Sequence, residues 1–193
     1  MNTTQPIRDC EQLEHFKNYY KDINLRNYTL IILGLNTALR ISDILNLTLE
    51  NVFNQDSVRR HIIIRERKTG KENCILLNDT VRRLLSLYYK ELKKTNSFQK
   101  GNPYLFPSPR SNEKPLSRFQ AYRIIRSAAD AIGIEDTISC HSMRKTFGYH
   151  AWKQGRDPLV IMIIFNHSSL SVTKRYLCLE QDDKDAVYRN TVL

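Results

Sequence analysis

The stretch between residues 25 and 39 constrains the fold more than any other part of the sequence. At its centre, residues 28–35, nearly every position is apolar, so a helix here would have no polar face. Such a helix must be covered on all sides by other elements. The apolar run at residues 30–35 is also far shorter than the roughly 20 residues that a membrane-spanning helix needs. We therefore predict a helix over residues 25–39 that is buried at the centre of a folded domain.

The composition fits one ordinary folded domain over residues 1–193. The chain is 41% hydrophobic and 26% charged, close to the averages for folded proteins, and it is long enough to bury a sizeable core. Its amino terminus lacks the apolar segment of a signal peptide. The four cysteines are far apart and include no C-x-x-C pair, which argues against a zinc cassette or a disulfide framework. They are Cys10, Cys74, Cys140 and Cys178. We expect a soluble cytoplasmic protein that does not associate with membranes.

The charge balance favours a polyanionic partner. Lys and Arg number 30 against 20 Asp and Glu, which gives a net charge of +10. Each phosphate that a basic side chain neutralises releases condensed counterions, so nucleic acid leads the possible partners. Many soluble proteins are basic for other reasons, and charge alone leaves the partner open.

Helical and strand patterns cover most of the rest of the chain. A first helix is expected over residues 10–20, opened by a capping box of Asp9 and Gln12, and a short helix over 42–47. Strands at 61–65 and 73–77 flank a basic turn at 68–71, which predicts a β-hairpin. Further helices are expected after the caps Asn78 and Ser117, over 81–92 and 117–133. The last helices are expected at 142–154, 158–165, 171–177 and 180–188.

The long connection over residues 95–115 is rich in proline and polar residues. It contains one apolar run, residues 104–106, which predicts a small strand. The fold class is therefore mainly α with a small antiparallel β-sheet (α+β).

Four segments carry residues that suit phosphate chemistry. They are Ala38-Leu-Arg40-Ile-Ser-Asp43, the hairpin with Lys68, His141-Ser-Met-Arg144, and the run from His167 to Tyr176. Arginine forks can bind phosphate oxygens in bidentate fashion and keep their charge. His141 and Arg144 are three residues apart, so on a helix both side chains lie on one face. An isolated arginine is more often a surface ion pair, and a basic hairpin tip is often merely solvated.

In this order and spacing, the four segments resemble the tyrosine recombinase (phage integrase) family from about residue 9 to the end of the chain. The resemblance implies the DNA breaking-rejoining catalytic-domain fold and metal-independent strand cleavage without a cofactor. It implies that Tyr176 attacks phosphorus to form a 3′-phosphotyrosyl bond and that Lys68 is the general acid. Arg40, His141, Arg144 and His167 would bind the scissile phosphate. Phe165-Asn166 replaces the Leu-Gly usual before the second histidine, and Asn is the next-best residue for a left-handed turn.

The expected partner is double-stranded DNA at specific recombination sites, for integration, excision or inversion of a mobile segment. Phosphate contacts are expected from Arg67, Lys71, Arg118 and Lys145. The resemblance implies a homo-tetramer on paired sites, an accessory directionality factor and association with the nucleoid. The tail, residues 179–193, would dock on a neighbouring protomer, although folding back on its own domain carries equal weight.

The family's usual amino-terminal core-binding domain is absent from this sequence. The sequence is therefore either a piece of a longer protein or a minimal enzyme that binds DNA through one face. Two other functions remain as alternatives: a type IB topoisomerase-like activity and a catalytically silent DNA-binding relative. The spacing from His167 to Tyr176 favours a recombinase over the first, and the presence of all six candidate residues argues against the second.

Overall fold

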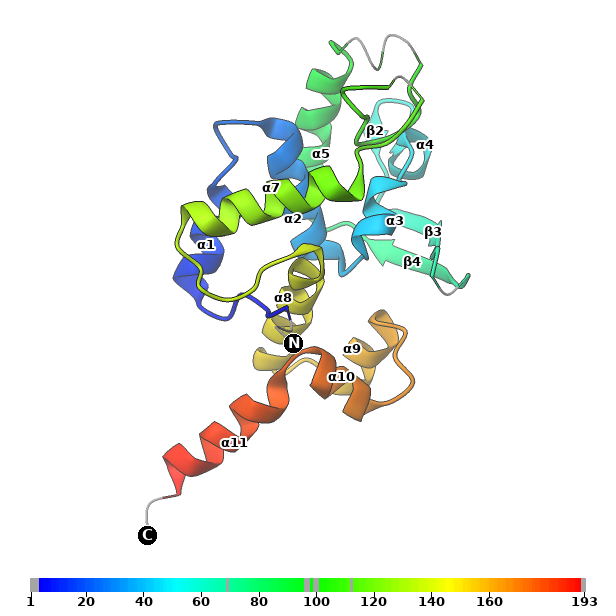
Figure 1. Ribbon diagram of the computed structural model, residues 1–193. Helices are drawn as coiled ribbons and strands as arrows, with labels where there is room; N and C mark the ends of the chain where they lie inside the picture. The colour runs from blue at the N-terminus through cyan, green and yellow to red at the C-terminus, as the bar shows by residue number, and fades with distance from the viewer. Residues whose placement is uncertain (1–3, 69, 96–97, 99–100, 112, 192–193) are drawn as a thin grey trace.

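The apolar helix lies at the centre of the molecule, as its sequence predicts. In this computed structural model α2 spans Leu25–Thr37 and is packed against α1 (Cys10–Asn18), α5 (Asp79–Leu92) and α8 (Cys140–Lys153). Figure 1 shows α2 in the middle of this group. Its side chains from residues 29 to 35 are all buried, so the helix has no solvent-facing side over this length. The structure describes residues 4–68, 70–95, 98, 101–111 and 113–191, and for 180–183 the backbone alone.

Further helices and two small sheets complete the fold of the described residues. The remaining helices are α3 (Ile41–Leu45), α4 (Leu49–Val52), α7 (Arg118–Ala131), α9 (Pro158–Ile164), α10 (Leu170–Tyr176) and α11 (Leu179–Asn190). The strands are β1 (Phe53–Asn54), β2 (Ser57–Val58), β3 (His61–Arg65) and β4 (Glu72–Leu76). The predicted fold class, mainly helical with antiparallel strands, is confirmed. Among the described residues, no helix combines the length and the apolar character needed to cross a membrane.

The predicted hairpin forms, with its second strand one residue earlier than expected. Strands β3 and β4 pair antiparallel, and Ile63 lies opposite Cys74. The predicted cap Ser117 opens α7, where it forms a capping box with Gln120, and the predicted cap Asn78 opens α5. Asp9 accepts a hydrogen bond from the backbone N–H of Gln12 and so caps α1, which is one of the two hydrogen bonds of the predicted capping box. Side-chain caps of this kind satisfy backbone N–H groups that a helix leaves unpaired in its first turn.

Two expectations about strands were wrong. The structure has a second two-stranded sheet, β1 with β2, in addition to the one sheet that the sequence predicts. Residues 104–106 form no strand; Tyr104 makes an isolated bridge with Thr48 instead. Pro103 and Pro107 flank this run, and proline has no N–H to donate to a ladder.

A second, smaller hydrophobic cluster holds the carboxy-terminal helices against α8. Its buried members are Ala38, Tyr149, Ile161, Phe165, Leu177 and Leu179. Gly148 makes this packing possible, because a Cβ atom there would lie 2.6 Å from side-chain atoms of both Phe165 and Leu177. The cluster therefore fixes α9 and α10 on α8, next to the turn between α2 and α3.

Candidate active site

Arg40 projects from a sharp turn between α2 and α3. Ala38 ends α2 in the left-handed region, with φ of 55°, and Arg40 is the N-cap of α3. The Arg40 side chain is 16% exposed, and its Nη1 donates to Glu66 Oε2 over 2.6 Å. Burial of Ala38 in the second cluster and this ion pair hold the guanidinium in a defined place. Only Nη1 takes part in that ion pair, so other N–H groups of the guanidinium remain to bind an anion.

Arg144 joins the three segments that carry the site. It lies on α8, is 3% exposed, and donates from Nη1 to the carbonyl of Ala38 and from Nη2 to the carbonyl of Phe165 at 2.9 Å. Its guanidinium also lies 4.5 Å from the centre of the Phe165 ring. Burial lowers the pKa of Arg144 to about 10, which leaves it charged at neutral pH. Arg144 thus fixes the turn before Arg40 and the segment before His167 relative to each other.

Tyr176 is the last residue of α10 and is half-buried beside His167. The centres of the two rings are 5.0 Å apart in an edge-to-face arrangement. Burial raises the pKa of Tyr176, while the charges of Arg144 and Arg40 and a hydrogen bond with Arg144 oppose that rise. The phenol is therefore neutral in this state, next to two cations that stabilise it once it loses its proton.

His167 follows a left-handed residue, as the Phe165-Asn166 sequence predicted. Asn166 has φ of 52°. The Nδ1 of His167 lies 3.1 Å from Thr173 Oγ1, and that hydroxyl donates its own hydrogen to the carbonyl of Ser169. We infer that Nδ1 carries the proton of the neutral ring and that Nε2 presents its lone pair. Burial first, and then the charges of Arg144, Arg40 and Lys68, lower the pKa of His167 to about 4.

His141 and Lys68 approach the same place from opposite elements. His141 lies in the first turn of α8, and its pKa is lowered by burial and by the charges of Arg118, Lys145, Arg144 and Lys68. Lys68 is exposed in the turn after β3. Its charge acts on the pKa of both His141 and His167, so its ammonium lies within electrostatic range of each ring. The structure thus brings all six predicted catalytic residues into one neighbourhood.

Three of the four residues expected to contact DNA are exposed near this site. Arg67 and Lys71 flank Lys68 on the hairpin turn, and Arg118 begins α7. The charge of Arg118 reaches His141, which places the start of α7 beside the catalytic residues.

Lys145 does not have the position expected of a DNA-contacting residue. It is 4% exposed, and its Nζ donates to the carbonyl of Thr4 at 2.7 Å and to Cys178 Sγ at 3.4 Å. The ammonium also lies 5.2 Å from the centre of the Tyr176 ring. We therefore correct that expectation: in this structure the side chain binds inside the protein, next to the nucleophile candidate, where a DNA phosphate would not reach it.

Two buried carboxylates belong to the site, and sequence reasoning gave neither a role. Glu66 pairs with Arg40, and Asp43 Oδ1 accepts from the backbone N–H of Arg67 at 3.1 Å. Burial raises the pKa of Asp43. Asp43 lies three residues after Arg40 in a motif already noted, and that spacing is the one signal that could have identified it. Nothing local marks Glu66, because it lies among charged residues that look like a solvated turn.

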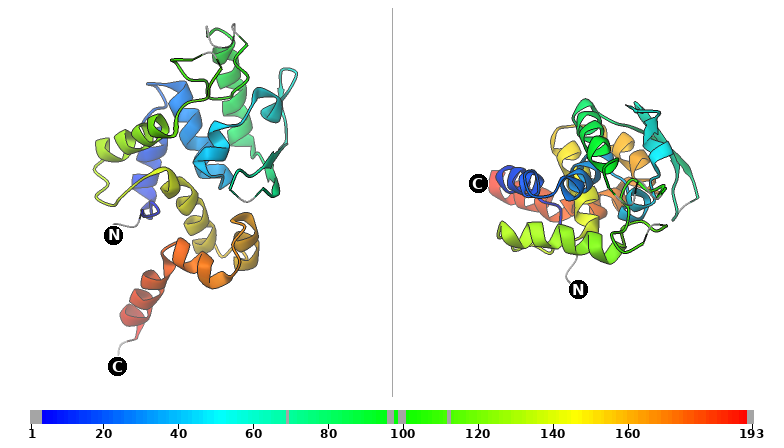
Figure 2. Two further views of the ribbon diagram at one scale, coloured as in Figure 1. Left: turned by 45° about the vertical axis from the view of Figure 1, so that its right-hand side comes forward. Right: turned by 90° about the horizontal axis from the view of Figure 1, so that it is seen from above.

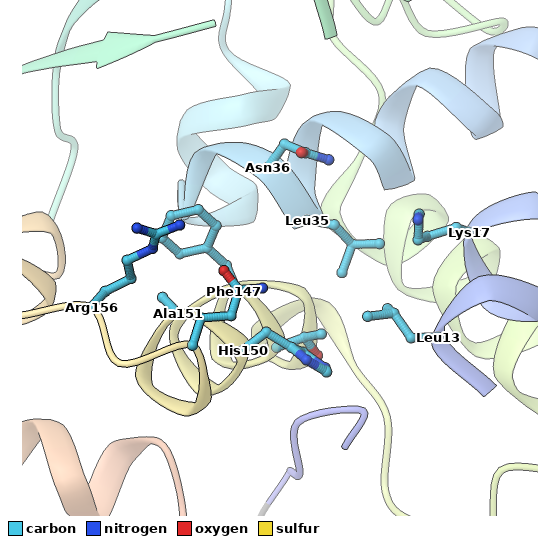
Figure 3. Close-up of a pocket in the computed structure, with 10 residues that line it drawn as sticks. Leu13, Lys17, Leu35, Asn36, Phe147, His150, Ala151 and Arg156 are labelled. Carbon is cyan, nitrogen blue, oxygen red and sulfur yellow. The ribbon is translucent and has the colours of Figure 1, made fainter. Parts of the chain in front are cut away.

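The hollow in Figure 3 lies away from these residues. It is lined from α1, α2 and α8, and Leu13, Leu35, Phe147 and His150 point toward it. None of the six catalytic candidates is among its lining residues. The described residues also contain no group of three His, Cys, Asp or Glu side chains arranged to hold a metal ion.

A mostly helical fold that brings two arginines, two histidines, a lysine and a tyrosine into one neighbourhood is typical of a tyrosine recombinase. The family model "Phage integrase family" matches residues 8–182. The chain belongs to this family.

Relatives with curated names agree with this assignment. The chain is 42% identical over 189 residues to "Probable integrase/recombinase YoeC" of Bacillus subtilis, covering 98% of this chain and 97% of that protein. It is 30% identical over 154 residues to "Tyrosine recombinase XerA" of Pyrococcus horikoshii, covering 79% of this chain and 50% of that protein. The chain thus spans nearly all of the first relative and half of the second.

Solved structures share the fold. The crystal structure of XerA recombinase superposes with a TM-score of 0.77 at 21% identity, covering 99% of this chain and 68% of that one. XerH site-specific recombinase, bound to a palindromic difH substrate after cleavage, superposes with a TM-score of 0.75 at 19% identity. That match covers 97% of this chain and 53% of XerH.

Proposed function

We propose that this chain catalyses site-specific DNA recombination by cutting and rejoining strands through Tyr176. The Tyr176 oxygen attacks the scissile phosphorus, the new O–P bond forms, and the bond from phosphorus to the 5′ oxygen breaks. The phenolic proton passes to a neutral imidazole of the His141 and His167 pair, and Lys68 gives a proton to the leaving 5′ oxygen. The product is a 3′-phosphotyrosyl bond and a free 5′ hydroxyl, and the reverse reaction rejoins a strand.

One observation carries this proposal: the Arg144 guanidinium holds together the turn before Arg40 and the segment before His167. Both arginines act on the pKa of Tyr176, and both act on the pKa of His167. Preorganised cations around a phosphate stabilise its transition state without rearranging during the reaction. Desolvation and the surrounding cations lower the pKa of both imidazoles below the ordinary histidine value, so each ring is neutral at pH 7, as proton acceptance from the phenol requires.

The DNA would lie across the face that carries the hairpin turn and the start of α7. Arg67, Lys71 and Arg118 are exposed there and would neutralise phosphates on either side of the cut. XerH and the Tn1549 transposon integrase were solved bound to DNA, and each shares this fold with the chain. We further propose a homo-tetramer on paired sites, with an accessory factor setting the direction of recombination.

The tail supports the proposed tetramer. Helix α11 extends away from the body of the molecule in both side views (Figures 1 and 2). Val187 is 64% exposed and Tyr188 81% exposed, so their apolar surface is not covered by the chain's own domain. A helix with an uncovered apolar face is marginal alone, and a neighbouring protomer would supply the missing surface.

The test is trapping on nicked duplexes, from which a short fragment is lost after cleavage so that rejoining fails. A pool with a randomised central region avoids the need to know the target. Wild-type protein should form DNA adducts that survive denaturant, Tyr176→Phe should form none, and the control Tyr89→Phe should behave as wild type. DNA binding without adducts would instead identify a silent binding relative. Relaxation of supercoiled plasmid that lacks any enriched sequence would favour topoisomerase-like activity.

A further inference from the structure

Glu66 is a carboxylate beside the proposed phosphate-binding site, where a negative charge is unfavourable. Its side chain is 0% exposed and lies within reach of Arg40, the arginine proposed to bind the scissile phosphate. Its charge also raises the pKa of Arg144 and of Asp43. A negative group beside a bound phosphate repels it, and a buried carboxylate costs free energy unless it is paired. We therefore expect Glu66 to have a structural role that offsets this cost.

The Glu66 side chain ties the hairpin to the catalytic turn. Oε2 accepts from Arg40 Nη1 at 2.6 Å, and Oε1 accepts from Asn73 Nδ2, on the opposite strand β4, at 3.2 Å. One carboxylate thus bridges the start of α3 and both strands of the hairpin. The backbone N–H of Arg67 donates to Asp43, so a second hydrogen bond joins the hairpin to α3.

The Glu66 main chain closes the turn that carries Lys68. Its N–H donates to the carbonyl of Lys71 at 2.9 Å, and its carbonyl accepts from the N–H of Gly70 at 2.8 Å. Gly70 has φ of 67°, a conformation that permits this tight turn. Lys68 itself is exposed, so the direction of its side chain depends on how the base of the turn is held.

We propose that Glu66 is a positioning residue that places the Lys68 ammonium at the leaving 5′ oxygen by locking the hairpin turn onto Arg40. This inference rests on the function proposed above. When Arg40 binds a phosphate, the ion pair with Glu66 keeps the base of the hairpin beside it, so the acid arrives where the phosphate is held. The cost of the repulsive charge is offset by correct placement of the proton donor.

The experiment compares two leaving groups on the same DNA sequence, taken from the duplexes recovered by trapping. In the second substrate, sulfur replaces the bridging 5′ oxygen. Cleavage then breaks a P–S bond and releases a thiolate, which needs no proton. A variant that has lost only proton donation is slow on the oxygen substrate and recovers on the sulfur substrate. Lys68→Ala is the reference, because loss of a general acid slows a reaction by about a hundredfold or more.

Glu66→Ala should be slower than wild type on oxygen by about tenfold to a hundredfold, the scale of a displaced catalytic group, and should recover most of that loss on sulfur. Glu66→Gln keeps the side-chain volume and can still bond Asn73, so it should show the same dependence on the leaving group with a smaller loss. Glu91, on α5, is an exposed carboxylate paired with Lys94. Glu91→Gln is therefore the matched control and should equal wild type on both substrates.

The ratio of the two rates is measured on one preparation, so partial unfolding lowers both rates and leaves the ratio unchanged. Equal losses on oxygen and sulfur, or no loss on either, would overturn the role of Glu66. A Lys68→Ala variant that sulfur does not rescue would remove the premise and overturn it as well. Failure of the wild-type protein to form adducts on either substrate would refute the proposed function itself, which is a distinct result.

Discussion

Arg40, Arg144 and His167 are each held by main-chain carbonyls or by a buried side chain. Arg144 donates to two carbonyls, and His167 donates to Thr173, a fully buried threonine. Such contacts order the site before DNA arrives, so little rearrangement is needed during cleavage. Partial desolvation, and after it the charges of the surrounding cations, lowers the pKa values of both histidines.

Acidification should destabilise the folded protein through His167. Its pKa is about 4 in the folded state against 6.5 for an ordinary histidine. Between these values the unfolded chain binds a proton that the folded chain does not, so stability falls as the pH drops through this window. His141, whose pKa is also lowered, acts in the same direction.

Urea unfolding of wild type and His167→Gln at about pH 7 and about pH 5 measures this effect. The free energy of unfolding of the wild type should fall more on acidification than that of His167→Gln, in which this titrating group is gone. Equal pH dependence in the two proteins would show that His167 is not held neutral by the fold.

At the residue scale, the sequence indicates the candidate residues that belong to a motif. It does not indicate the residues that only the fold brings to the site. All six catalytic candidates lie in the four segments whose order and spacing resemble those of the family. Glu66 looked like part of a solvated, charged turn, and its burial depends on Arg40, which is 26 residues away. Lys145 looked exposed because its neighbours are polar, while its partners Thr4 and Cys178 lie at opposite ends of the chain.

At the scale of elements, helices were predictable wherever a side-chain cap and an apolar period coincide. The boundaries of α5 and α7 follow from Asn78 and Ser117, which accept backbone N–H groups in the first turn. The short elements α4, β1 and β2 were not predicted, because two to four residues are too few to show a helical or strand pattern of apolar residues. Their formation depends on tertiary contacts, such as the stacking of Phe53 on Tyr89 of α5 at 4.1 Å.

Gly148→Ala should loosen the junction of α8 with α9 and α10. In an exposed helix this change stabilises by about 1 kcal/mol, because glycine is a poor helix former. Here the new Cβ would lie 2.6 Å from Phe165 and Leu177 side-chain atoms, which flank His167 and Tyr176. We expect a loss of roughly 1–3 kcal/mol in the free energy of unfolding, the usual cost of overpacking, together with slower cleavage.

Gly34→Ala is the comparison for this prediction. Its Cβ would meet the Sδ and Cε atoms of Met143, the far end of a flexible side chain that can move aside. It should therefore cost less than Gly148→Ala, as measured by thermal unfolding of both. A Gly148→Ala protein that is more stable than wild type and cleaves at the normal rate would refute the tight contact.

At the scale of the whole molecule, the structure has a basic body and an extended carboxy-terminal helix. The net charge of +10 suits a phosphate-rich partner. Leu179 is buried in the second cluster, only three residues after Tyr176, whereas Val187 and Tyr188 are exposed farther along α11. Any protomer that binds the outer part of α11 is thereby connected to the segment that carries the nucleophile.

Removing the apolar surface of α11 should separate DNA binding from assembly. The double variant Val187→Ser and Tyr188→Ser changes only exposed side chains, so the fold and binding to a single site should be unaffected. Recombination and pairing of two sites should fall, because the uncovered face proposed to dock on a neighbour is gone. Gel-shift and recombination assays measure the two properties. Deletion of residues 182–193 should likewise leave binding to a single site intact and reduce recombination. Normal recombination by both variants would show that α11 does not couple protomers.

The most direct test of the account is to find the amino acid that becomes joined to DNA. Wild-type protein trapped on nicked duplexes is digested with nuclease and trypsin, and the peptide that retains a nucleotide is identified by mass spectrometry. We predict a modification in the peptide over residues 176–184, on the oxygen of Tyr176 and linked to a 3′ phosphate. A nucleotide on any other of the ten tyrosines, or a link through a 5′ phosphate, would contradict the assignment of Tyr176 and the reaction built on it.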